Sequence, residues 1–459
     1  MKIRIVGGGP AGLYFAILMK RLDAANDVVV FERDGPDDTF GWGIVFSDQT
    51  FGYLKDQDEP SYQAISAACE RWDNVDVVHR EQKITIRGNR FSGIQRLKFL
   101  NILHRRCREL GVDLRFNTRV TDDDVAGMED LLVGADGANS GIRRLFVDEL
   151  QPTVELGRNK YIWLGTTRLF HGLTLTFRAS TDGAFAAHSY KFSSTMSTFI
   201  VECAEATWAR AGLAGMSQRE TCDYLARVFA VDLEDHPLLT NDFVKWLNFP
   251  LVANRRWHHG RVALLGDALH TAHFSIGSGT KLALEDAIAL ADCLRKDSEI
   301  SQALERFERD RKPVIEEYQR AARESQSWFE DLDHALALEP HELAYELMTR
   351  SKKIDLEKLR QRDPEFVAQY ETFRRGTRLQ PGRQSDSLTP QKRRSARPRR
   401  TAPDSATSRT ARSATASRQR EALRPSRRSG RRARGPSTAV RTGPSDERRR
   451  SGSCGPGDR

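Results

Sequence analysis

Apolar and polar residues alternate over the first 34 positions in a pattern that predicts a strand, a helix and a second strand. Apolar side chains dominate 3–6 and 28–31, and their spacing between 11 and 20 is helical. A glycine-rich break at 7–12 separates the first strand from the helix. A chain that begins in this way is expected to form a doubly wound α/β sheet.

The later pattern divides the chain into segments of different character. The spacing predicts a helix at 95–110 and strands at 112–116, 131–133 and 262–265, with a looser stretch before about Gln82. Residues 155–203 are rich in β-branched and aromatic residues, which predicts an inserted antiparallel sheet, and a helix follows at 218–230. Helices are expected from about 279 to Met348, with one interruption at Pro313. The resulting segments are 1–154 and 261–376 for a nucleotide-binding domain and its C-terminal helices, and 155–260 for a β-rich substrate domain.

The last 83 residues, 377–459, differ in composition from the rest. They contain 22 Arg and one Lys against six acidic residues, a net charge of +17 that leaves the preceding residues at −8. No aromatic residue follows Phe373. Such a segment cannot bury enough apolar surface to fold, so we expect it to be disordered. A nucleic-acid-binding arm is one interpretation, but a solvated or artefactual tail is preferred.

Cysteine usage and hydropathy indicate the compartment. The six cysteines form no CxxC pair and no cluster with metal-ligand spacing, so neither a metal site nor a disulfide framework is expected. No apolar run approaches the roughly 20 residues needed to span a bilayer. We therefore expect a cytoplasmic protein with reduced thiols and no membrane association.

The break at 7–12 fits the pattern GxGxxG between a predicted strand and a predicted helix. Its first glycine permits a tight turn, the second permits approach of a diphosphate, and the third permits close packing of helix and strand. Glu32 lies 20 residues beyond Gly12, at the end of the second strand, where a carboxylate can bind a ribose. These features favour an ADP-containing ligand over a fortuitous glycine turn.

Two further polar segments follow predicted strands. Residues 134–140 read GADGANS, and a bare Asp-Gly of this kind is also common in tight turns. Residues 266–267 are Gly-Asp, and 277–280 are Gly-Ser-Gly-Thr at the start of a predicted helix. A helix start lined with glycines can donate N–H groups to phosphate or ribityl oxygens.

The three segments in this order resemble the single-component FAD-dependent aromatic hydroxylases, over roughly residues 1–345. The resemblance implies an extended FAD, with NADH or NADPH as a co-substrate bound only transiently. It also implies a reaction with O2 through a C4a-hydroperoxyflavin. The implied cofactor-binding residues are Gly7, Gly9, Pro10, Ala11, Gly12, Glu32, Arg33, Arg96, Asp136, Asp267, Gly277 and Gly279.

Three other stretches point to a subgroup. The sequences GWGIVFSD (41–48), GRNKYIWLGTT (157–167) and SYKFSSTMSTFIVEC (189–203) look like the hydroxylases of salicylyl-CoA and anthraniloyl-CoA, with the indole hydroxylases of violacein synthesis nearby. The resemblance therefore implies hydroxylation of an electron-rich aromatic ring, carried as a CoA thioester. An indole hydroxylase, or a flavin-dependent reductase without oxygen insertion, remains an alternative.

Candidate substrate and catalytic residues come from the β-rich segment and from 266–280. Trp163 and Tyr190 are expected to line the substrate pocket, although aromatic residues on alternating strands are more often sheet core. Arg158 and Lys160 are candidates for binding CoA at the pocket mouth, with a charged strand edge as the equal alternative. His188 and His273 are candidates for proton transfer.

Overall fold

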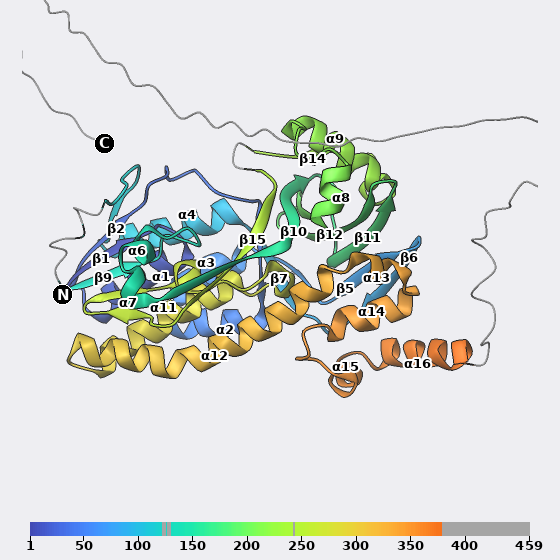
Figure 1. Ribbon diagram of the computed structural model, residues 1–459. Coiled ribbons are helices and arrows are strands. Elements are labelled where there is room, and N and C mark those ends of the chain that lie inside the picture. The colour runs from blue at the N-terminus through green and yellow to red at the C-terminus, as the bar shows by residue number, and fades with distance from the viewer. Residues whose placement is uncertain (122–124, 126–129, 242–243, 379–459) are drawn as a thin grey trace, which may run out of the picture. The chain divides into compact units, whose positions relative to one another are not determined.

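The predicted strand, helix and strand at the start of the chain are present as β1 (Lys2–Val6), α1 (Pro10–Leu22) and β2 (Asp27–Phe31) in the computed structural model (Figure 1). The structure describes residues 1–378 except 122–124, 126–129 and 242–243. The segment expected to be disordered therefore lies outside the described residues from 379 onward. The described residues belong to one compact unit.

The molecule has two halves, each built on one large sheet. The first half is centred on a six-stranded sheet in the order β16-β17-β9-β1-β2-β8. Its other strands are β8 (Asp113–Arg115), β9 (Leu131–Gly134), β16 (His258–His259) and β17 (Val262–Leu264). All neighbouring strands are parallel except the pair β16 and β17. Because β1, β9 and β17 are parallel neighbours, the three polar segments that follow them meet at one edge of the sheet.

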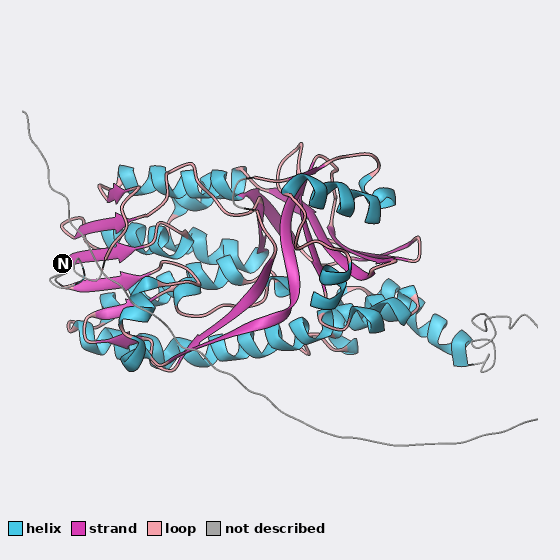
Figure 2. Ribbon diagram, turned by 45° about the horizontal axis from the view of Figure 1, so that its top comes forward, coloured by secondary structure: helices cyan, strands magenta, loops and turns pink. Residues whose placement is uncertain are grey.

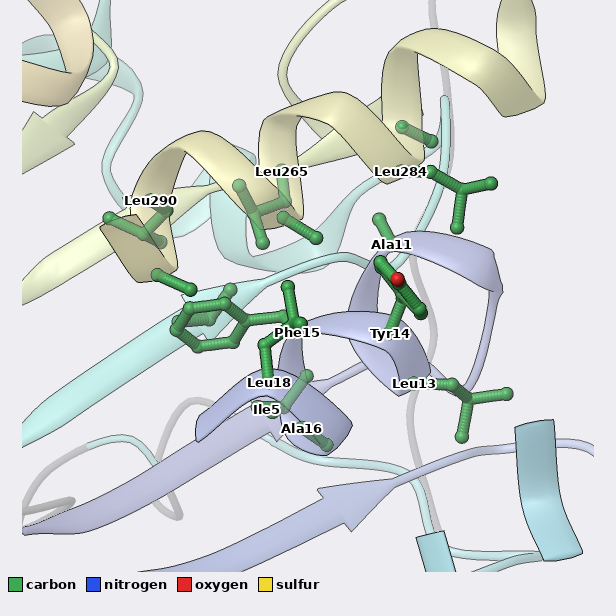
Figure 3. Packing of buried hydrophobic residues seen from close by; sticks show 14 of the residues in the cluster. Ile5, Ala11, Leu13, Tyr14, Phe15, Ala16, Leu18, Leu265, Leu284 and Leu290 are labelled. Carbon is green, nitrogen blue, oxygen red and sulfur yellow. The ribbon is translucent and has the colours of Figure 1, made fainter. Parts of the chain in front are cut away.

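Helices pack on this sheet through a continuous apolar core. Helix α1 buries every residue from Ala11 to Met19, which explains why it is apolar on all sides. Figure 3 shows Phe15 and Leu18 of α1 between β1 and α11 (Gly279–Lys296), which contributes Leu284 and Leu290. Helix α4 (Arg96–Glu109) confirms the helix predicted at 95–110.

The stretch before Gln82 is more regular than the sequence predicted. It contains β3 (Gly43–Ser47), α2 (Asp48–Gln57), α3 (Glu59–Ala67) and β4 (Glu70–Trp72), and β3 and β4 pair with β7 (Phe91–Gln95). Pro60 lies in the first turn of α3, where its missing N–H has no helical partner to lose. Asp58 caps the same helix by accepting a hydrogen bond from the Ser61 N–H.

The second half is built on a large sheet in the order β14-β10-β13-β12-β11-β5-β6, with β15 beside β10 (Figures 1 and 2). Its strands are β5 (Val75–His79), β6 (Gln82–Ile86), β10 (Pro152–Thr166), β11 (Leu173–Ser180), β12 (Gly183–Lys191), β13 (Ser197–Cys203), β14 (Leu238–Leu239) and β15 (Leu247–Asn254). Strands β10 to β13 are antiparallel where they pair, as predicted, whereas β5 is parallel to β11. The sheet thus also takes strands from before residue 155.

Two apolar clusters cover the two faces of this sheet. Side chains alternate along β12, so that Ala184 and Ala186 join one cluster while Phe185 and Ala187 join the other. The first cluster includes α13 (Leu332–Ala337), α14 (Pro340–Thr349), α15 (Leu356–Arg362) and α16 (Pro364–Arg378). The second includes residues of α9 (Gln218–Val228) and α10 (Ala230–Leu233), with α8 (Glu205–Arg210) nearby.

Helix α12 (Ile300–Phe329) runs past both halves of the molecule (Figure 1). Pro313 lies inside this continuous helix, so the predicted interruption at Pro313 is wrong. A proline in a helix interior costs about 3 kcal/mol. Burial of Phe307 in the core of the first half and of Phe329 in the second offsets this cost by tertiary packing. Across the described residues, no helix combines the length and apolar character needed to cross a membrane.

Candidate active site

A cavity of about 470 Å³ opens at the edge of the six-stranded sheet where the three polar segments meet. The segments contribute Gly9 to Ala11, then Ala135 and Gly137, then Asp267 and 275–280 to its walls. The cavity continues to the large sheet, where His188 and Tyr190 of β12 border it. One continuous space therefore joins the predicted nucleotide site to the predicted substrate site.

The three glycines of the first motif have different structural roles. A β-carbon on Gly7, which has a φ of +113°, would lie 2.2 Å from the Ala135 carbonyl oxygen, and one on Gly12 would lie 2.2 Å from the Gly7 carbonyl oxygen. Gly9 precedes α1, and a β-carbon there would meet no atom within 4 Å. Gly7 and Gly12 thus permit the packing, while Gly9 leaves open space at a helix N-terminus, where a diphosphate would fit.

Glu32 is held at the end of β2 by two backbone donors. Its carboxylate accepts hydrogen bonds from the N–H groups of Gly8 at 2.7 Å and Asp34 at 2.9 Å. It borders a second cavity of about 80 Å³, together with Gly9 and Arg96. Arg33 forms an ion pair with Asp34 at 3.1 Å and does not border either cavity.

Arg96, the first residue of α4, borders both cavities. Burial lowers the pKa of its guanidinium, and the nearby charge of Asp267 opposes this effect. The Arg96 Nε is buried and has no hydrogen-bond acceptor in the described part of the chain. Because an unpaired buried donor is costly, this group indicates a bound anion such as a phosphate.

Asp267 lies in the 3₁₀ turn η1 (Gly266–Ala268) that follows β17. The Asp267 side chain is exposed to the cavity, but the surrounding protein limits its solvation and so raises the pKa of its carboxyl, an effect that the charge of Arg96 opposes. The side chain faces the cavity, together with the N-terminus of α11, where a β-carbon on Gly279 would meet no atom within 4 Å. Gly277, with a φ of +62°, makes the turn that leads into this helix. Asp267 and the helix start can therefore bind hydroxyl and phosphate oxygens.

Asp136 has a local structural role. Its carboxylate accepts hydrogen bonds from the Ser140 hydroxyl at 2.5 Å and the Gly141 N–H at 2.6 Å, and so supports the start of α6 (Gly141–Leu145), whose N-cap is Ser140. Its neighbours Ala135 and Gly137 border the cavity, whereas Asp136 does not. Arg143, which is buried, donates to the Ala268 carbonyl at 2.9 Å and so joins the second segment to the third.

The sequence did not reveal the network that supports η1. His270 donates to the buried carboxylate of Asp286 at 2.8 Å, and Arg311 of α12 donates to the same carboxylate at 3.0 Å. The Gly266 N–H also lies 3.3 Å from Asp286. Asp286 is a single acidic residue on a predicted helix. The sequence gives no signal for its role, because its partners come from other elements.

Replacement of Asp267 by alanine is expected to weaken FAD binding about ten- to hundredfold, because a carboxylate that accepts a hydrogen bond contributes about 1.5–3 kcal/mol. Titration of the apoprotein with FAD, followed by flavin fluorescence, measures the change in Kd. Arg33→Gln serves as the control and should bind FAD normally. Equal Kd values for Asp267→Ala and the parent would contradict the placement of Asp267 at the cofactor.

Comparison with known proteins decides the family. Residues 1–322 match the FAD binding domain family. The chain is 42% identical over 379 residues to salicyloyl-CoA 5-hydroxylase of a Streptomyces species, an alignment that covers 80% of this chain and 72% of that protein. The chain belongs to the FAD-dependent aromatic monooxygenases. FAD is therefore its cofactor, and the open space at Gly9, the unpaired Arg96 Nε and the Asp267 carboxylate fit this group.

Other relatives of this FAD-dependent monooxygenase act on different aromatic compounds. It is 34% identical to protodeoxyviolaceinate monooxygenase of Chromobacterium violaceum, with 77% of this chain and 95% of that protein covered. It is 36% identical to 3-hydroxy-4-methyl-anthranilyl-[aryl-carrier protein] 5-monooxygenase of Streptosporangium sibiricum, with coverage of 72% and 89%. A solved structure of 2-methyl-3-hydroxypyridine-5-carboxylic acid oxygenase has the same fold, with a TM-score of 0.59, 18% identity and coverage of 77% and 96%.

In this monooxygenase the GWG sequence at 41–43 packs against the large sheet. The Trp163 ring covers Gly41, where a β-carbon would come within 2.7 Å of it, and the Trp42 ring covers Gly165 in the same way. The Gly43 carbonyl accepts a hydrogen bond from the Tyr190 hydroxyl at 2.8 Å. Gly41, Gly43 and Gly165 therefore each leave room for an aromatic ring. This packing explains the GWG motif, whose role the sequence alone did not explain.

The structure places both predicted aromatic residues at the cavity. Trp163 and Tyr190 border it, with Leu175, Ile200 and Phe274 supplying apolar surface nearby. Burial raises the pKa of Tyr190, so its hydroxyl stays neutral and holds the Gly43 carbonyl. These two residues can therefore position an aromatic ring but are not arranged to accept its proton.

The two candidate histidines have different surroundings. His188 borders the cavity and lies 2.6 Å from the Glu202 carboxylate through Nε2. His273 is buried outside the cavity lining, and its Nδ1 lies 2.7 Å from the Ser275 hydroxyl oxygen. Burial lowers the pKa of His273 to about 4. His273 is thus neutral and shapes η2 (Phe274–Ile276), whereas His188 can contact a ligand.

The two candidate cations for CoA do not border the cavity. Arg158 forms an ion pair with Glu330 at 2.8 Å, and Lys160 lies 2.6 Å from Asn248 and 3.4 Å from Glu205. The cavity instead reaches Lys353, in the loop between α14 and α15, and Arg362 at the end of α15. The Lys353 ammonium lies 3.6 Å from the centre of the Tyr318 ring and 3.4 Å from the Glu317 carboxylate.

Proposed function

We propose that this monooxygenase hydroxylates an electron-rich aromatic ring carried as a thioester, such as salicylyl-CoA or anthraniloyl-CoA. NADH or NADPH supplies the electrons, and O2 supplies the oxygen atom. The observation that carries the proposal is the 42% identity to salicyloyl-CoA 5-hydroxylase. The relative named for a ring bound to an aryl-carrier protein also supports a substrate attached to a large carrier.

Different residues along the cavity have different roles in this proposal. Bound FAD supplies electron transfer and oxygen activation. Gly9 and Gly279, at two helix N-termini, together with Arg96, bind its phosphates, and Asp267 binds hydroxyl groups of the ribityl chain. Trp163 and Tyr190 hold the aromatic ring, and the apolar wall around them excludes water from the reaction. We place the enzyme in the cytoplasm, in keeping with the five described cysteines as thiols.

The open end of the cavity is the proposed path for the thioester. Lys353 and Arg362 border the cavity and are both partly exposed, so we place the open end beside them. The aryl ring occupies the inner cavity, and the CoA chain passes between these cations, which bind its phosphates. Lys353 and Arg362 thus take the role that the sequence suggested for Arg158 and Lys160.

Aryl-CoA thioesters are expected to stimulate NAD(P)H oxidation with kcat/KM values at least about tenfold above those of the free acids, because contacts to CoA supply binding energy remote from the ring. The assay compares salicylyl-CoA and anthraniloyl-CoA with salicylate, anthranilate and an indole. Mass spectrometry measures the hydroxylated product. Equal stimulation of NAD(P)H oxidation by the free acid and by its thioester would contradict the thioester proposal.

Paired variants locate the CoA contact. Lys353→Gln and Arg362→Gln should raise KM for the thioester severalfold with little change in kcat. Arg158→Gln and Lys160→Gln are the matched controls, because both positions lie outside the cavity lining. A rise in KM for the controls alone would instead indicate that CoA binds at Arg158 and Lys160, as the sequence suggested.

The similarity to protodeoxyviolaceinate monooxygenase supports an indole-type hydroxylase as the second candidate. Hydroxylation of the indole alone in the same panel would favour it. A flavin-dependent reductase would instead oxidise NAD(P)H and give a product without an added oxygen atom. The mass of the product therefore separates all three possibilities.

A further inference from the structure

A buried carboxylate and imidazole form a pair in the wall of the cavity. His188 of β12 lies opposite Ile200 of β13, and Glu202 is two residues further along β13, so both side chains lie on the same face of the sheet. The His188 Nε2 and a Glu202 carboxylate oxygen are 2.6 Å apart, and both side chains are buried. The pair lies on the sheet face toward α12, where Phe329 contacts the His188 ring at 4.7 Å between centres.

Glu202 is fixed from its other side as well. Asn159 of β10 donates to the second Glu202 oxygen at 3.1 Å and to the Phe329 carbonyl at 2.8 Å. The Arg350 guanidinium donates to neutral oxygens, including the Ser275 carbonyl at 2.6 Å and the Ser325 hydroxyl at 2.8 Å. Burial lowers the pKa of Arg350 to about 10, and the charge of Glu202 opposes this effect. Arg350 therefore keeps its positive charge at neutral pH and lies close enough to Glu202 for their charges to interact.

This arrangement selects one tautomer of His188. An ionised Glu202 accepts a hydrogen bond from Nε2–H, so in the neutral ring the lone pair is on Nδ1. Within the described part of the chain, Nδ1 has no hydrogen-bond partner, and the ring borders the cavity. The other titratable or charged groups that face the pair are His273, which is neutral, Arg350, and Glu330, which is paired with Arg158.

We infer that His188 accepts the proton of a hydroxyl group on the substrate ring and that Glu202 is the residue that positions it. The inference rests on the proposed function, which supplies the ring. The substrate O–H bond breaks, the proton moves to Nδ1, and the ring oxygen becomes a phenolate. The imidazolium keeps its Nε2–H on the Glu202 carboxylate. No oxidant or reductant takes part in this step.

The step prepares the ring for hydroxylation. A phenolate places more electron density on the ortho and para carbons than the neutral phenol, so these carbons react more readily with an electrophilic oxygen. The charge pair between imidazolium and carboxylate is stabilised because Glu202 is already held by Asn159. An amino group needs no such ionisation, so the pair should matter for a hydroxyl-bearing ring and much less for an amino-bearing ring.

The test is the ionisation state of a bound phenol, measured in the FAD-loaded enzyme without NAD(P)H, so that no turnover occurs. Difference absorbance spectra of bound salicylyl-CoA are recorded across pH for the parent, Glu202→Gln and His188→Gln. The parent is expected to bind the phenolate at a pH where the free ligand is neutral. The variants should bind the neutral phenol, with FAD content and ligand affinity retained.

Turnover gives the second readout. Glu202→Gln should lower kcat with salicylyl-CoA about ten- to hundredfold and shift its pH profile, with a much smaller effect on anthraniloyl-CoA. Neutral phenol in the parent, phenolate in both variants, or equal losses with both thioesters would each overturn the role of the pair. If Glu202→Gln fails to retain FAD, His188→Gln alone decides by the same spectra. If the parent binds no aryl thioester, the proposed function fails, and the inference falls with it.

Discussion

Replacement of Gly9 by valine is expected to yield a folded protein that contains almost no FAD. A β-carbon at position 9 would meet no protein atom within 4 Å, and the backbone there has a φ of −79°, which any residue adopts. The added side chain would instead fill the space at the N-terminus of α1 in which we propose that the FAD diphosphate lies. The absorbance of the purified protein measures bound FAD, and circular dichroism measures the fold.

The same substitution three residues later provides the control. A β-carbon on residue 12 would lie 2.2 Å from the Gly7 carbonyl oxygen and 3.0 Å from Ile5. Gly12→Val should therefore lower the Tm of the apoprotein strongly, whereas Gly9→Val should leave it nearly unchanged. Full FAD occupancy in Gly9→Val would show that the first motif does not bind the diphosphate. A matching loss of Tm in both variants would show that position 9 is part of the packing.

The FAD half could be predicted from the sequence because its signals are local. A strand, a GxGxxG turn and a helix occupy 21 consecutive residues, from Lys2 to Leu22, and each part constrains the next. The sequence also placed each of the three polar segments after a predicted strand, and the structure makes those strands parallel neighbours. Gly9 and Asp267 border the cavity, while Gly7 and Gly12 permit the close packing beside it.

The substrate half was less predictable because its contacts join distant parts of the chain. Glu202 is one acidic residue on a strand, and only the pairing of β12 with β13 brings it to His188. Lys353 lies in a loop after α14, so no pattern along the chain connects it to the cavity. The charges of Arg158 and Lys160 beside aromatic residues suggested a CoA contact, but Glu330 pairs with Arg158 and Asn248 of the neighbouring strand β15 binds Lys160.

Asp136 illustrates a different limit. The sequence placed its segment after a predicted strand and suggested that Asp136 binds the cofactor, yet the side chain accepts hydrogen bonds at the start of α6 and only its neighbours border the cavity. A motif thus indicates where a loop lies better than it indicates which atoms of the loop face a ligand. The same holds for the histidines after Asp267, because His270 binds Asp286 and His273 binds Ser275.

Asp286→Asn is expected to destabilise the protein by about 3–5 kcal/mol and to weaken FAD binding as well. The Asp286 carboxylate is fully buried and is the shared partner of His270 and Arg311. The amide cannot balance the charge of Arg311, and its NH2 group is a donor that cannot replace a carboxylate oxygen, because donors face both oxygens of Asp286. Because His270 and Gly266 lie close to Asp267 along the chain, we expect a change in this network to move also the Asp267 carboxylate, the proposed contact of the ribityl chain. Denaturant unfolding of the apoprotein measures the first effect, and FAD titration measures the second.

Asp292→Asn on the same helix is the matched control, since Asp292 pairs with Arg295 at the surface and should contribute less than about 1 kcal/mol.

The pH dependence of stability gives a further check on Asp286. Burial alone would raise the pKa of Asp286, but the charges and hydrogen bonds of His270 and Arg311 outweigh it and lower that pKa. A carboxylate with a lowered folded-state pKa stabilises the fold fully above its unfolded pKa of about 4, and this contribution is lost as the pH falls through the folded-state value. The difference between the parent and Asp286→Asn should therefore be largest at neutral pH and should shrink in acid below about pH 4. A difference in unfolding free energy that stays constant down to strongly acidic pH, or one no larger than that of Asp292→Asn, would show that the Asp286 charge does not hold the Gly266–Asp267 segment in place.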